Sequence, residues 1–387
     1  MKLPSSSLKE GLNRLGAERL LDLWGYVRSW RTRDRLVVLE SDDWGAVRMP
    51  GQNAFNSMVG KGLGIENSRF DYFDCLESGE DLGMLFEVLD ESRGASGSPA
   101  VMTMNMVMGN PDFEAIREDQ FQNFHHEGFF TSYQRYYGES LESLWQSAIQ
   151  AGLIKPQFHA REHLNSALWL HDLNLGREET RFAFEHGFYG QSAGTSSRYQ
   201  KTYLAAYWAE GPQELIHVGS VLADGLNQFE STFGFPSKTF IGCNYVWPTE
   251  IESALHEQGV ELLQGQRGHL IPQLQLGGRL SIRRRYAGQS SSAGQFYSVR
   301  NVRFEPYEDP TVDWVDRAVS EIARAFRFRC PAVISSHRIN YTSGMCQKHR
   351  NQNVALLRDL LRQIRRLWPD VLFISSDQLL DHIQAPA

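Results

Sequence analysis

Short apolar runs alternate with helical patterns along most of this chain, and this alternation limits the possible folds more than any other feature. Six of the runs are short, bounded by polar or turn-forming residues, and typical of buried strands. They cover residues 35–41, 101–108, 154–158, 237–243, 332–336 and 371–376. Between them, apolar residues recur every three or four positions, as on the inner face of a helix packed on a sheet. These helical patterns cover residues 82–89, 141–149, 251–255, 315–326 and 354–367.

A strand followed by a helix, repeated along the chain, is typical of an α/β fold with parallel strands. Segment 259–305 adds three β-like pieces, VELLQG, RLSIRRRY and FYSVRNVRF. With them the strands number seven or eight, which is enough to close a barrel. Residues 174–236 interrupt the alternation with a stretch rich in Gly, Ser and aromatic residues. We predict one barrel domain over 35–387 with an insertion at about 174–236, after a helical extension over 1–34.

The charge balance argues against a nucleic-acid-binding surface. The chain has 39 basic and 46 acidic residues, a formal net charge of −7. No run approaches the ~20 apolar residues that a membrane span needs, and charges interrupt the first thirty residues, unlike a signal peptide. The absence of a CxxC pair favours free thiols in a reducing compartment, and hence a cytoplasmic protein without a membrane span. The four cysteines are Cys75, Cys243, Cys330 and Cys346.

Polar side chains follow the predicted strands where each strand ends. In parallel α/β folds the carboxyl ends of the strands meet at one edge, and sites are built there. We therefore expect these residues to lie close together. They are Asp42 and Asp43, Asn105, the HAREH string at 159–163, the segment 243–248, Glu305, and His337 with Arg338 and Asn340.

Two of these groups indicate a divalent metal. Adjacent carboxylates after a buried strand repel each other unless they lie in open water or hold something positive between them. Neutral imidazole is the commonest metal ligand, and the spacing of His159 and His163 puts both on one side of a turn. One aspartate with two histidines is a sensible divalent site that leaves positions for water and substrate. The alternative is that one histidine caps a helix and the other lies on the surface.

The string H-x-x-E-H also matches a zinc-protease motif, in which both histidines lie on one helix and Glu162 is the base. Here Pro156 biases the residue before it toward extended geometry. We therefore predict that His159 lies at a strand exit and that a helix begins near Asn165 or Ser166. A zinc protease is kept as an alternative.

The order of these motifs resembles that of the polysaccharide deacetylases (NodB-like, carbohydrate esterase family 4). The shared features are SDDWG, the His-x-x-x-His pair, a proline-containing loop before a helix, and a late strand that ends in histidine. They are scattered over residues 35–377. The resemblance implies a distorted (β/α)7-type barrel with parallel strands, and a metal-dependent hydrolase that removes acetyl groups from N-acetylated sugars or glycan precursors.

The resemblance also implies a role for each matching residue. Asp42 would be the general base and His337 the general acid. Asp43, His159 and His163 would bind a divalent metal, Zn²⁺ in the first place, with Co²⁺, Ni²⁺ or Mn²⁺ as alternatives. Glu40 is expected to point to the other side of the strand, because side chains alternate.

The chain departs from the family pattern in two ways. Trp44 is inserted before Gly45, and the loop at 241–248 lacks the arginine that normally holds the base. Arg161, Arg303 and Arg338 are the candidates to replace this arginine. The missing arginine also motivates a second hypothesis, a catalytically inactive barrel that binds carbohydrate.

Several residues near the strand ends are candidates for binding a carbohydrate substrate. Aromatic faces suit sugar rings, although the two tryptophans could simply belong to the core. Glu305, like Arg303, is consistent either with a salt-bridged scaffold or with a role in orienting the base or the acid. The backbone N–H of one candidate, the tyrosine, could donate to an oxyanion. The candidates are Trp44, Asn244, Tyr245, Trp247 and Arg303.

Overall fold

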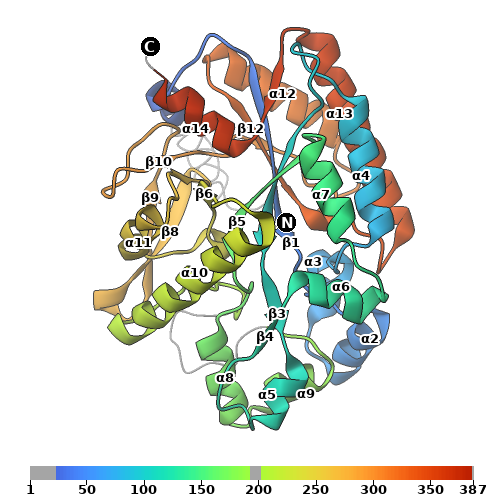
Figure 1. The fold of residues 1–387 in the computed structure, drawn as a ribbon, viewed down its shortest axis with the longest axis vertical. Coiled ribbons are helices and arrows are strands. Elements are labelled where there is room, and N and C mark those ends of the chain that lie inside the picture. The colour runs from blue at the N-terminus through green and yellow to red at the C-terminus, as the bar shows by residue number, and fades with distance from the viewer. Residues whose placement is uncertain (1–22, 192–201, 386–387) are drawn as a thin grey trace, which may run out of the picture.

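The computed structural model describes residues 23–191 and 202–385. Within these ranges, nine parallel strands form one sheet that curls into an open barrel (Figure 1). The strand order is β10-β7-β6-β5-β2-β1-β12-β11, and β13 pairs with the start of β1. The strands are β1 (Leu36–Trp44), β2 (Met102–Val107), β5 (Ile154–Ala160), β6 (Thr239–Phe240), β7 (Leu262–Leu263), β10 (Phe296–Tyr297), β11 (Val302–Arg303), β12 (Ala332–His337) and β13 (Leu372–Ile374).

The predicted parallel α/β barrel is confirmed, and each of the six predicted strand segments contains a strand of this sheet. The sheet has more strands than the seven that the resemblance implies, because segment 259–305 supplies β7, β10 and β11. The prediction for RLSIRRRY as a barrel strand is wrong. That segment forms β9 (Arg279–Arg284), which pairs antiparallel with β8 (Gly268–Gln273) in a separate hairpin. A second hairpin joins β3 (Gly109–Pro111) and β4 (His126–Gly128).

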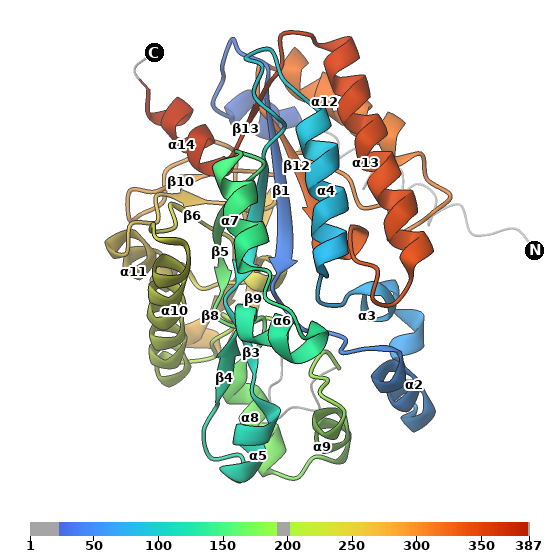
Figure 2. The same cartoon turned by 45° about the vertical axis from the view of Figure 1, so that its right-hand side comes forward.

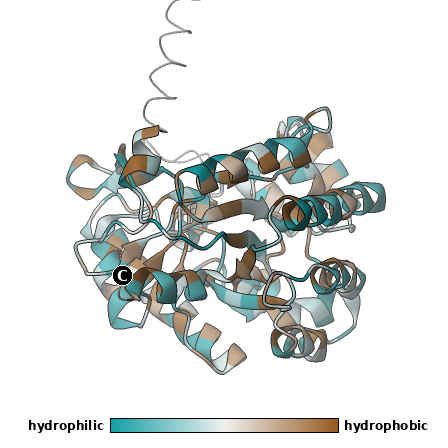
Figure 3. Ribbon diagram, turned by 90° about the horizontal axis from the view of Figure 1, so that it is seen from above, coloured by the Kyte–Doolittle hydropathy of each residue, from teal (hydrophilic) through white to brown (hydrophobic). Residues whose placement is uncertain are grey.

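Helices cover the outside of the curled sheet, and α4, α12 and α13 pack side by side on one flank (Figure 2). Seen from above, hydrophobic residues gather on the central strands (Figure 3). The five predicted helical patterns coincide with α4, α7, α11, α12 and α13. The helices are α2 (Gln52–Lys61), α3 (Arg69–Phe73), α4 (Gly79–Glu91), α5 (Phe113–Glu118), α6 (Phe129–Tyr137), α7 (Glu142–Gln150), α8 (Ser166–Asn174), α9 (Glu178–Glu185), α10 (Pro212–Phe233), α11 (Glu252–Glu257), α12 (Trp314–Arg327), α13 (Gln347–Leu367) and α14 (Ser376–Gln384).

A short segment joins the two ends of the sheet. Residues 298–301 connect β10 to β11, the outermost strands of the strand order. The backbone N–H of Arg300 donates to the carbonyl of Gly265 after β7, and the N–H of Asn301 donates to the carbonyl of Val333 in β12. This segment therefore forms hydrogen bonds first with one end of the sheet and then with the other. Arg300 lies where it passes between them.

The predicted insertion at 174–236 contains α9 and the long helix α10, while residues 192–201 lie outside the described ranges. The connection from β5 to β6 runs through α10, which packs against β5. Of the predicted N-terminal extension, residues 1–22 are also outside the described ranges, and residues 23–28 are helical. No helix among the described residues is both long and apolar enough to cross a membrane.

The contact between α10 and β5 depends on a glycine. A Cβ atom at Gly225 would lie 2.7 Å from the ring of Phe158 and 2.9 Å from the Cβ of Arg161. We predict that Gly225→Ala lowers the free energy of unfolding by about 1–3 kcal/mol, because the extra methyl group overpacks this contact. Gly219→Ala is the matched control on the same helix, since nothing lies within 4 Å of a Cβ there.

The control should stabilise the chain by up to about 1 kcal/mol through helix propensity. Denaturant unfolding of the two variants measures the difference. Equal stabilities for the two variants would contradict the close packing of α10 on β5.

Candidate active site

The carboxyl ends of the parallel strands surround a pocket of about 270 Å³. All five residues predicted as catalytic or metal-binding line this pocket. Of the substrate-binding candidates, Asn244 and Tyr245 line it as well. The sequence did not point to Arg48, Phe70, Leu204 and Gly242, which complete the lining. The five predicted residues are Asp42, Asp43, His159, His163 and His337.

Of the three predicted metal ligands, Asp43 contacts both histidines. One carboxylate oxygen of Asp43, Oδ1, lies 3.3 Å from Nε2 of His159 and 3.3 Å from Nε2 of His163. Tetrahedral ligands bonded to one zinc ion at about 2.0–2.1 Å lie about 3.3 Å from one another. Nδ1 of His159 donates to the carbonyl of Ile241, which leaves the Nε2 lone pair free to bind a cation. The donor atoms present therefore fit a divalent metal.

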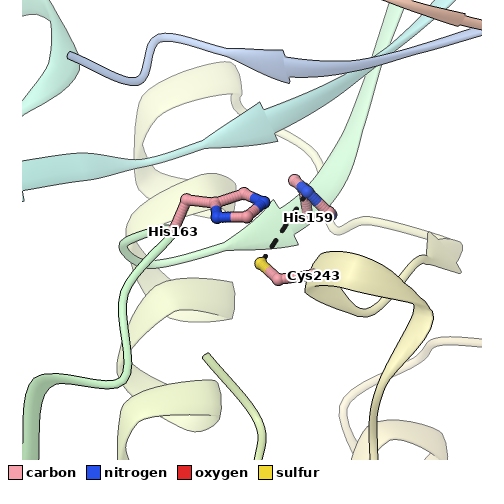
Figure 4. A group of neighbouring side chains, drawn as sticks. All are labelled: His159, His163 and Cys243. Carbon is pink, nitrogen blue, oxygen red and sulfur yellow. Dashed lines mark hydrogen bonds between the residues drawn. The ribbon is translucent and has the colours of Figure 1, made fainter. Parts of the chain in front are cut away.

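Cys243 is a fourth candidate ligand, although the sequence predicted only a free thiol. It forms no disulfide. Its Sγ lies 3.7 Å from Nε2 of His159, and the ligand atoms of His159, His163 and Cys243 all lie within 4.8 Å of one another (Figure 4). The signal that could have found it is its position three residues after the end of β6, near a strand end where other site residues occur.

The backbone is strained at the pocket. Among the described residues, six non-glycine residues have a positive φ. Three of them line the pocket: Asp43 (75°), Asn244 (56°) and Tyr245 (57°). Such conformations are costly and gather at functional sites. The pairing of β1 with β2 also shifts register between Ser41 and Trp44. This irregularity turns Asp43 so that it faces the same pocket as its neighbour Asp42.

Arg300 holds the predicted base. Its Nη1 and Nη2 donate to Oδ2 and Oδ1 of Asp42 at 2.6 Å each, and Asn105 donates to Oδ1 at 2.7 Å. Burial alone would raise the pKa of Asp42, but Arg300 lowers it to about 2. The sequence missed Arg300, because it is 258 residues away and lies in no recognised motif.

The prediction that Glu40 points away from the site is wrong. Nε of Arg300 donates to Glu40 at 2.7 Å, so the guanidinium bridges Glu40 and Asp42. The two side chains share a face because they are two residues apart on one strand. Ser376 donates a further hydrogen bond to Glu40.

The three arginines that the sequence offered as partners of the base lie elsewhere, so that prediction is wrong. Arg161 pairs with Asp224. Arg303, half of whose side chain is exposed, pairs with Glu308. Arg338 is buried and belongs to a separate charge cluster.

Arg338 stabilises the turn that follows the two aspartates. It pairs with Asp74 and Glu77, and it donates to the carbonyl of Ala46. Glu77 in turn accepts a hydrogen bond from the N–H of Gly45. This cluster anchors the backbone directly after Asp43.

His337 and Glu305 form a second charged pair at the pocket. Nδ1 of His337 lies 2.6 Å from Glu305, and Asn340 holds the other carboxylate oxygen of Glu305 at 2.9 Å. The register of β1 with β12 aligns Asp42 with His337, and Nε2 of His337 lies 3.6 Å from Oδ2 of Asp42. Burial alone would lower the pKa of His337, but Glu305 raises it well above its ordinary value.

Three of the substrate-binding predictions are wrong. Trp44 and Trp247 are each 1 % exposed and pack in the core, Trp44 against Tyr341 and Trp247 against His269. An aromatic residue next to a site motif cannot be told from a core residue by its type. Arg303 lies outside the pocket, as described above.

Tyr245, in the loop at 241–248, makes other contacts than the predicted donation of its N–H to an oxyanion. The N–H of Tyr245 donates to the carbonyl of Gly242, so it is not free to bind an oxyanion. The hydroxyl of Tyr245 accepts from Arg300 at 2.9 Å. The ring therefore stands beside the clamped carboxylate.

The H-x-x-E-H string does not lie on a helix. His159 belongs to β5, His163 follows in a loop, and α8 begins at Ser166 with Asn165 as its N-cap. The predicted helix start is confirmed. This arrangement lacks the single helix that the zinc-protease motif requires.

We predict that Arg300→Met lowers the free energy of unfolding by about 3–5 kcal/mol, because it leaves Glu40 and Asp42 buried without a counter-charge. Arg303→Met is the matched control, since Arg303 is exposed and only three residues away. The control should change stability by no more than about 0.5 kcal/mol. Urea unfolding of both variants measures the contrast, and similar losses for the two would contradict the role of Arg300.

We predict that Glu305→Gln lowers the pKa of His337 in metal-free protein. The carboxylate favours the protonated imidazole, so removing its charge moves the titration midpoint to lower pH. NMR titration of the ring protons measures the shift, with His337→Gln to identify the signal. Glu308→Gln, an acid three residues along the chain, should leave the midpoint unchanged. An unchanged midpoint in Glu305→Gln would show that the pair does not set this pKa.

No protein-family model matches this chain, and no curated protein matches it. Similar solved structures include a probable polysaccharide deacetylase from Pseudomonas aeruginosa PAO1, with 8% identity and a TM-score of 0.46 over 90% of this chain and 91% of that chain. A GH57-type branching enzyme from Pyrococcus horikoshii has 12% identity and a TM-score of 0.46 over 92% and 72%. Puue allantoinase has 8% identity and a TM-score of 0.42 over 91% of each chain. The Pseudomonas aeruginosa protein carries the name of the family that the sequence resembles. Similarities this low say nothing about the activity or the substrate of this chain.

Proposed function

We propose that this chain is a metal-dependent hydrolase that removes an acetyl group from an N-acetylated sugar or glycan precursor. The observation that carries the proposal is the convergence of Asp43, His159 and His163 beside Asp42 and His337 in one pocket. Amide hydrolysis needs a means to polarise the carbonyl, a group that accepts a proton from water, and a group that protonates the leaving nitrogen. This pocket offers residues for all three.

Asp43, His159 and His163 would hold the cation. Two imidazoles and a carboxylate suit Zn²⁺, with Co²⁺, Ni²⁺ or Mn²⁺ as alternatives. When bound, the cation would supply Lewis-acid polarisation of the acetyl carbonyl and lower the pKa of water.

Asp42 would orient the attacking water and take its proton. The carboxylate stays ionised because Arg300 lowers its pKa to about 2. Among the described residues, Oδ1 accepts from Arg300 and Asn105, whereas Oδ2 accepts from Arg300. Oδ2 lies 3.6 Å from Nε2 of His337, and the attacking water would lie on that side.

His337 would protonate the leaving nitrogen as the C–N bond breaks, which gives acetate and a free amine. Glu305 favours the protonated imidazole that this step needs. Afterwards the proton taken by Asp42 would return to His337 over the 3.6 Å that separates the two side chains. General acid–base help of this kind is worth ~10²–10⁴ in rate.

The volume and the lining of the pocket support a small acetylated sugar as substrate. Its volume of about 270 Å³ is near the lower limit of ligand pockets, which suits one sugar unit better than a long glycan. The rings of Phe70 and Tyr245 line it and suit a sugar face. The cytoplasmic location predicted from the sequence would favour a precursor over a cell-wall polymer.

The hypothesis of an inactive carbohydrate-binding barrel loses its main support. It was motivated by the missing loop arginine, and Arg300 makes the contact with the base from another segment. We therefore favour catalysis over binding alone.

We predict that Asp43→Ala lowers the bound metal content, whereas Asp42→Asn keeps the metal and lowers kcat by about 10²–10⁴. Asp42→Asn spares the proposed metal ligands but removes the proton acceptor. The measurements are elemental analysis of purified protein and acetate release from a panel of N-acetylated sugars, with and without a chelator. Asp224→Ala, which changes a half-exposed carboxylate outside the pocket, is the control for both.

Full activity in Asp42→Asn would contradict the proposed base. A full metal complement in Asp43→Ala would contradict the proposed ligand. Activity that survives chelation would contradict metal dependence.

A further inference from the structure

The sulfur of Cys243 lies against the two histidines that are proposed to bind the metal. Its Sγ is 3.7 Å from Nε2 of His159 and belongs with both imidazoles to one group of close ligand atoms. In Figure 4 the three side chains point toward one another, from the end of β5, from the loop after it and from the turn after β6. All three residues are buried.

Three distances among these side chains and Asp43 fit bonds to one ion. Ligand atoms at about 2.0–2.1 Å for nitrogen or oxygen and about 2.3 Å for sulfur lie about 3.3–3.7 Å apart around a tetrahedral zinc. The two Asp43–histidine distances are 3.3 Å, and the distance from Cys243 to His159 is 3.7 Å. The sulfur of Cys243 and the oxygen of Asp43 therefore each lie from Nε2 of His159 at the distance expected between two ligands of one tetrahedral ion.

The local backbone positions the histidine and the cysteine together. The carbonyl of Ile241 accepts from Nδ1 of His159, and Cys243 follows two residues later in the same segment. The hydrogen bond fixes the ring so that Nε2 faces the sulfur. Backbone carbonyls commonly orient metal-binding histidines in this way.

The other buried cysteines differ in their surroundings. Sγ of Cys330, for example, contacts the backbone carbonyls of Tyr26 and Phe328 at 3.7 Å, as expected for a thiol that donates weakly. A buried cysteine of that kind behaves as a small apolar residue. Sγ of Cys243 instead faces ring nitrogens, whose lone pairs suit a cation.

We propose that Cys243 is a ligand of the same cation as Asp43, His159 and His163. This rests on the proposed function only in that a metal is bound there. A sulfur ligand favours thiophilic ions such as Zn²⁺ and Co²⁺ over Mn²⁺. Four protein ligands would fill a tetrahedral site, so catalysis would require coordination to expand to five, which zinc permits.

Optical spectroscopy of the cobalt-loaded full chain tests the ligand directly. We expect a sulfur-to-cobalt charge-transfer band in the near ultraviolet for the wild-type protein. Cys243→Ser should lose this band and still bind cobalt through the remaining ligands. Cys330→Ser, which changes another buried cysteine, should keep it.

A competition titration with a chromophoric chelator adds a second readout. Loss of a residue that only hydrogen-bonds to a ligand lowers metal affinity by about 10–100-fold. Cys243→Ala should weaken cobalt binding by more than this, because it removes a ligand itself. Circular dichroism checks that each variant is folded. If a variant is unfolded, the optical spectrum of the cobalt-loaded wild-type protein still tests whether a sulfur ligand is present.

The outcomes separate this inference from the proposed function. Bound cobalt without the band in the wild-type protein would overturn the cysteine ligand and leave the proposed function standing. A protein that shows the charge-transfer band but releases acetate from no acetylated sugar would support Cys243 as a ligand and count against the proposed deacetylase activity. A protein that binds no cobalt would overturn the ligand as well as metal dependence.

Discussion

The buried ion cluster of Arg300 with Glu40 and Asp42 is the interaction on which both the barrel and the candidate site depend. The carboxylates come from the central strand β1, and the guanidinium comes from the segment that joins the two ends of the sheet. Removing one partner from such a cluster leaves an uncompensated charge that costs several kcal/mol. An apolar strand can therefore run into acidic residues because the fold delivers a guanidinium to two of them. The third, Asp43, faces two histidines instead.

Two neighbouring aspartates serve one pocket only because β1 is irregular at that point. In a regular strand Asp42 and Asp43 would face opposite sides of the sheet. The register shift after Ser41 and the positive φ of Asp43 turn the second carboxylate toward the first. Aspartate tolerates this conformation better than bulkier residues do. The cluster around Arg338 anchors the backbone that follows, so the strain is held in place by the surrounding structure.

Strand positions and the meeting of polar residues at strand ends could be predicted from the sequence, because apolar periodicity reports burial and parallel strands share an edge. That reasoning placed Asp43, His159 and His163 together correctly. It predicted FYSVRNVRF as β-like but missed the role of Arg300, since the residue lies between two strands of two residues each and nothing in the sequence shows that this connection meets β1. It misplaced Trp44 and Trp247, because residue type does not distinguish a pocket wall from the core. Cys243 satisfied the strand-end rule, but the lack of a second nearby cysteine suggested an inert thiol.

The distance along the chain between the clamped carboxylate and its guanidinium has a consequence for biosynthesis. Asp42 and Arg300 are 258 residues apart, so about two thirds of this 387-residue sequence is synthesised after Asp42 before this charge partner exists. Until then, β1 carries two acidic side chains that resist entry into an apolar interior. We therefore expect the acidic end of β1 to pack last, once the segment that carries Arg300 has emerged from the ribosome.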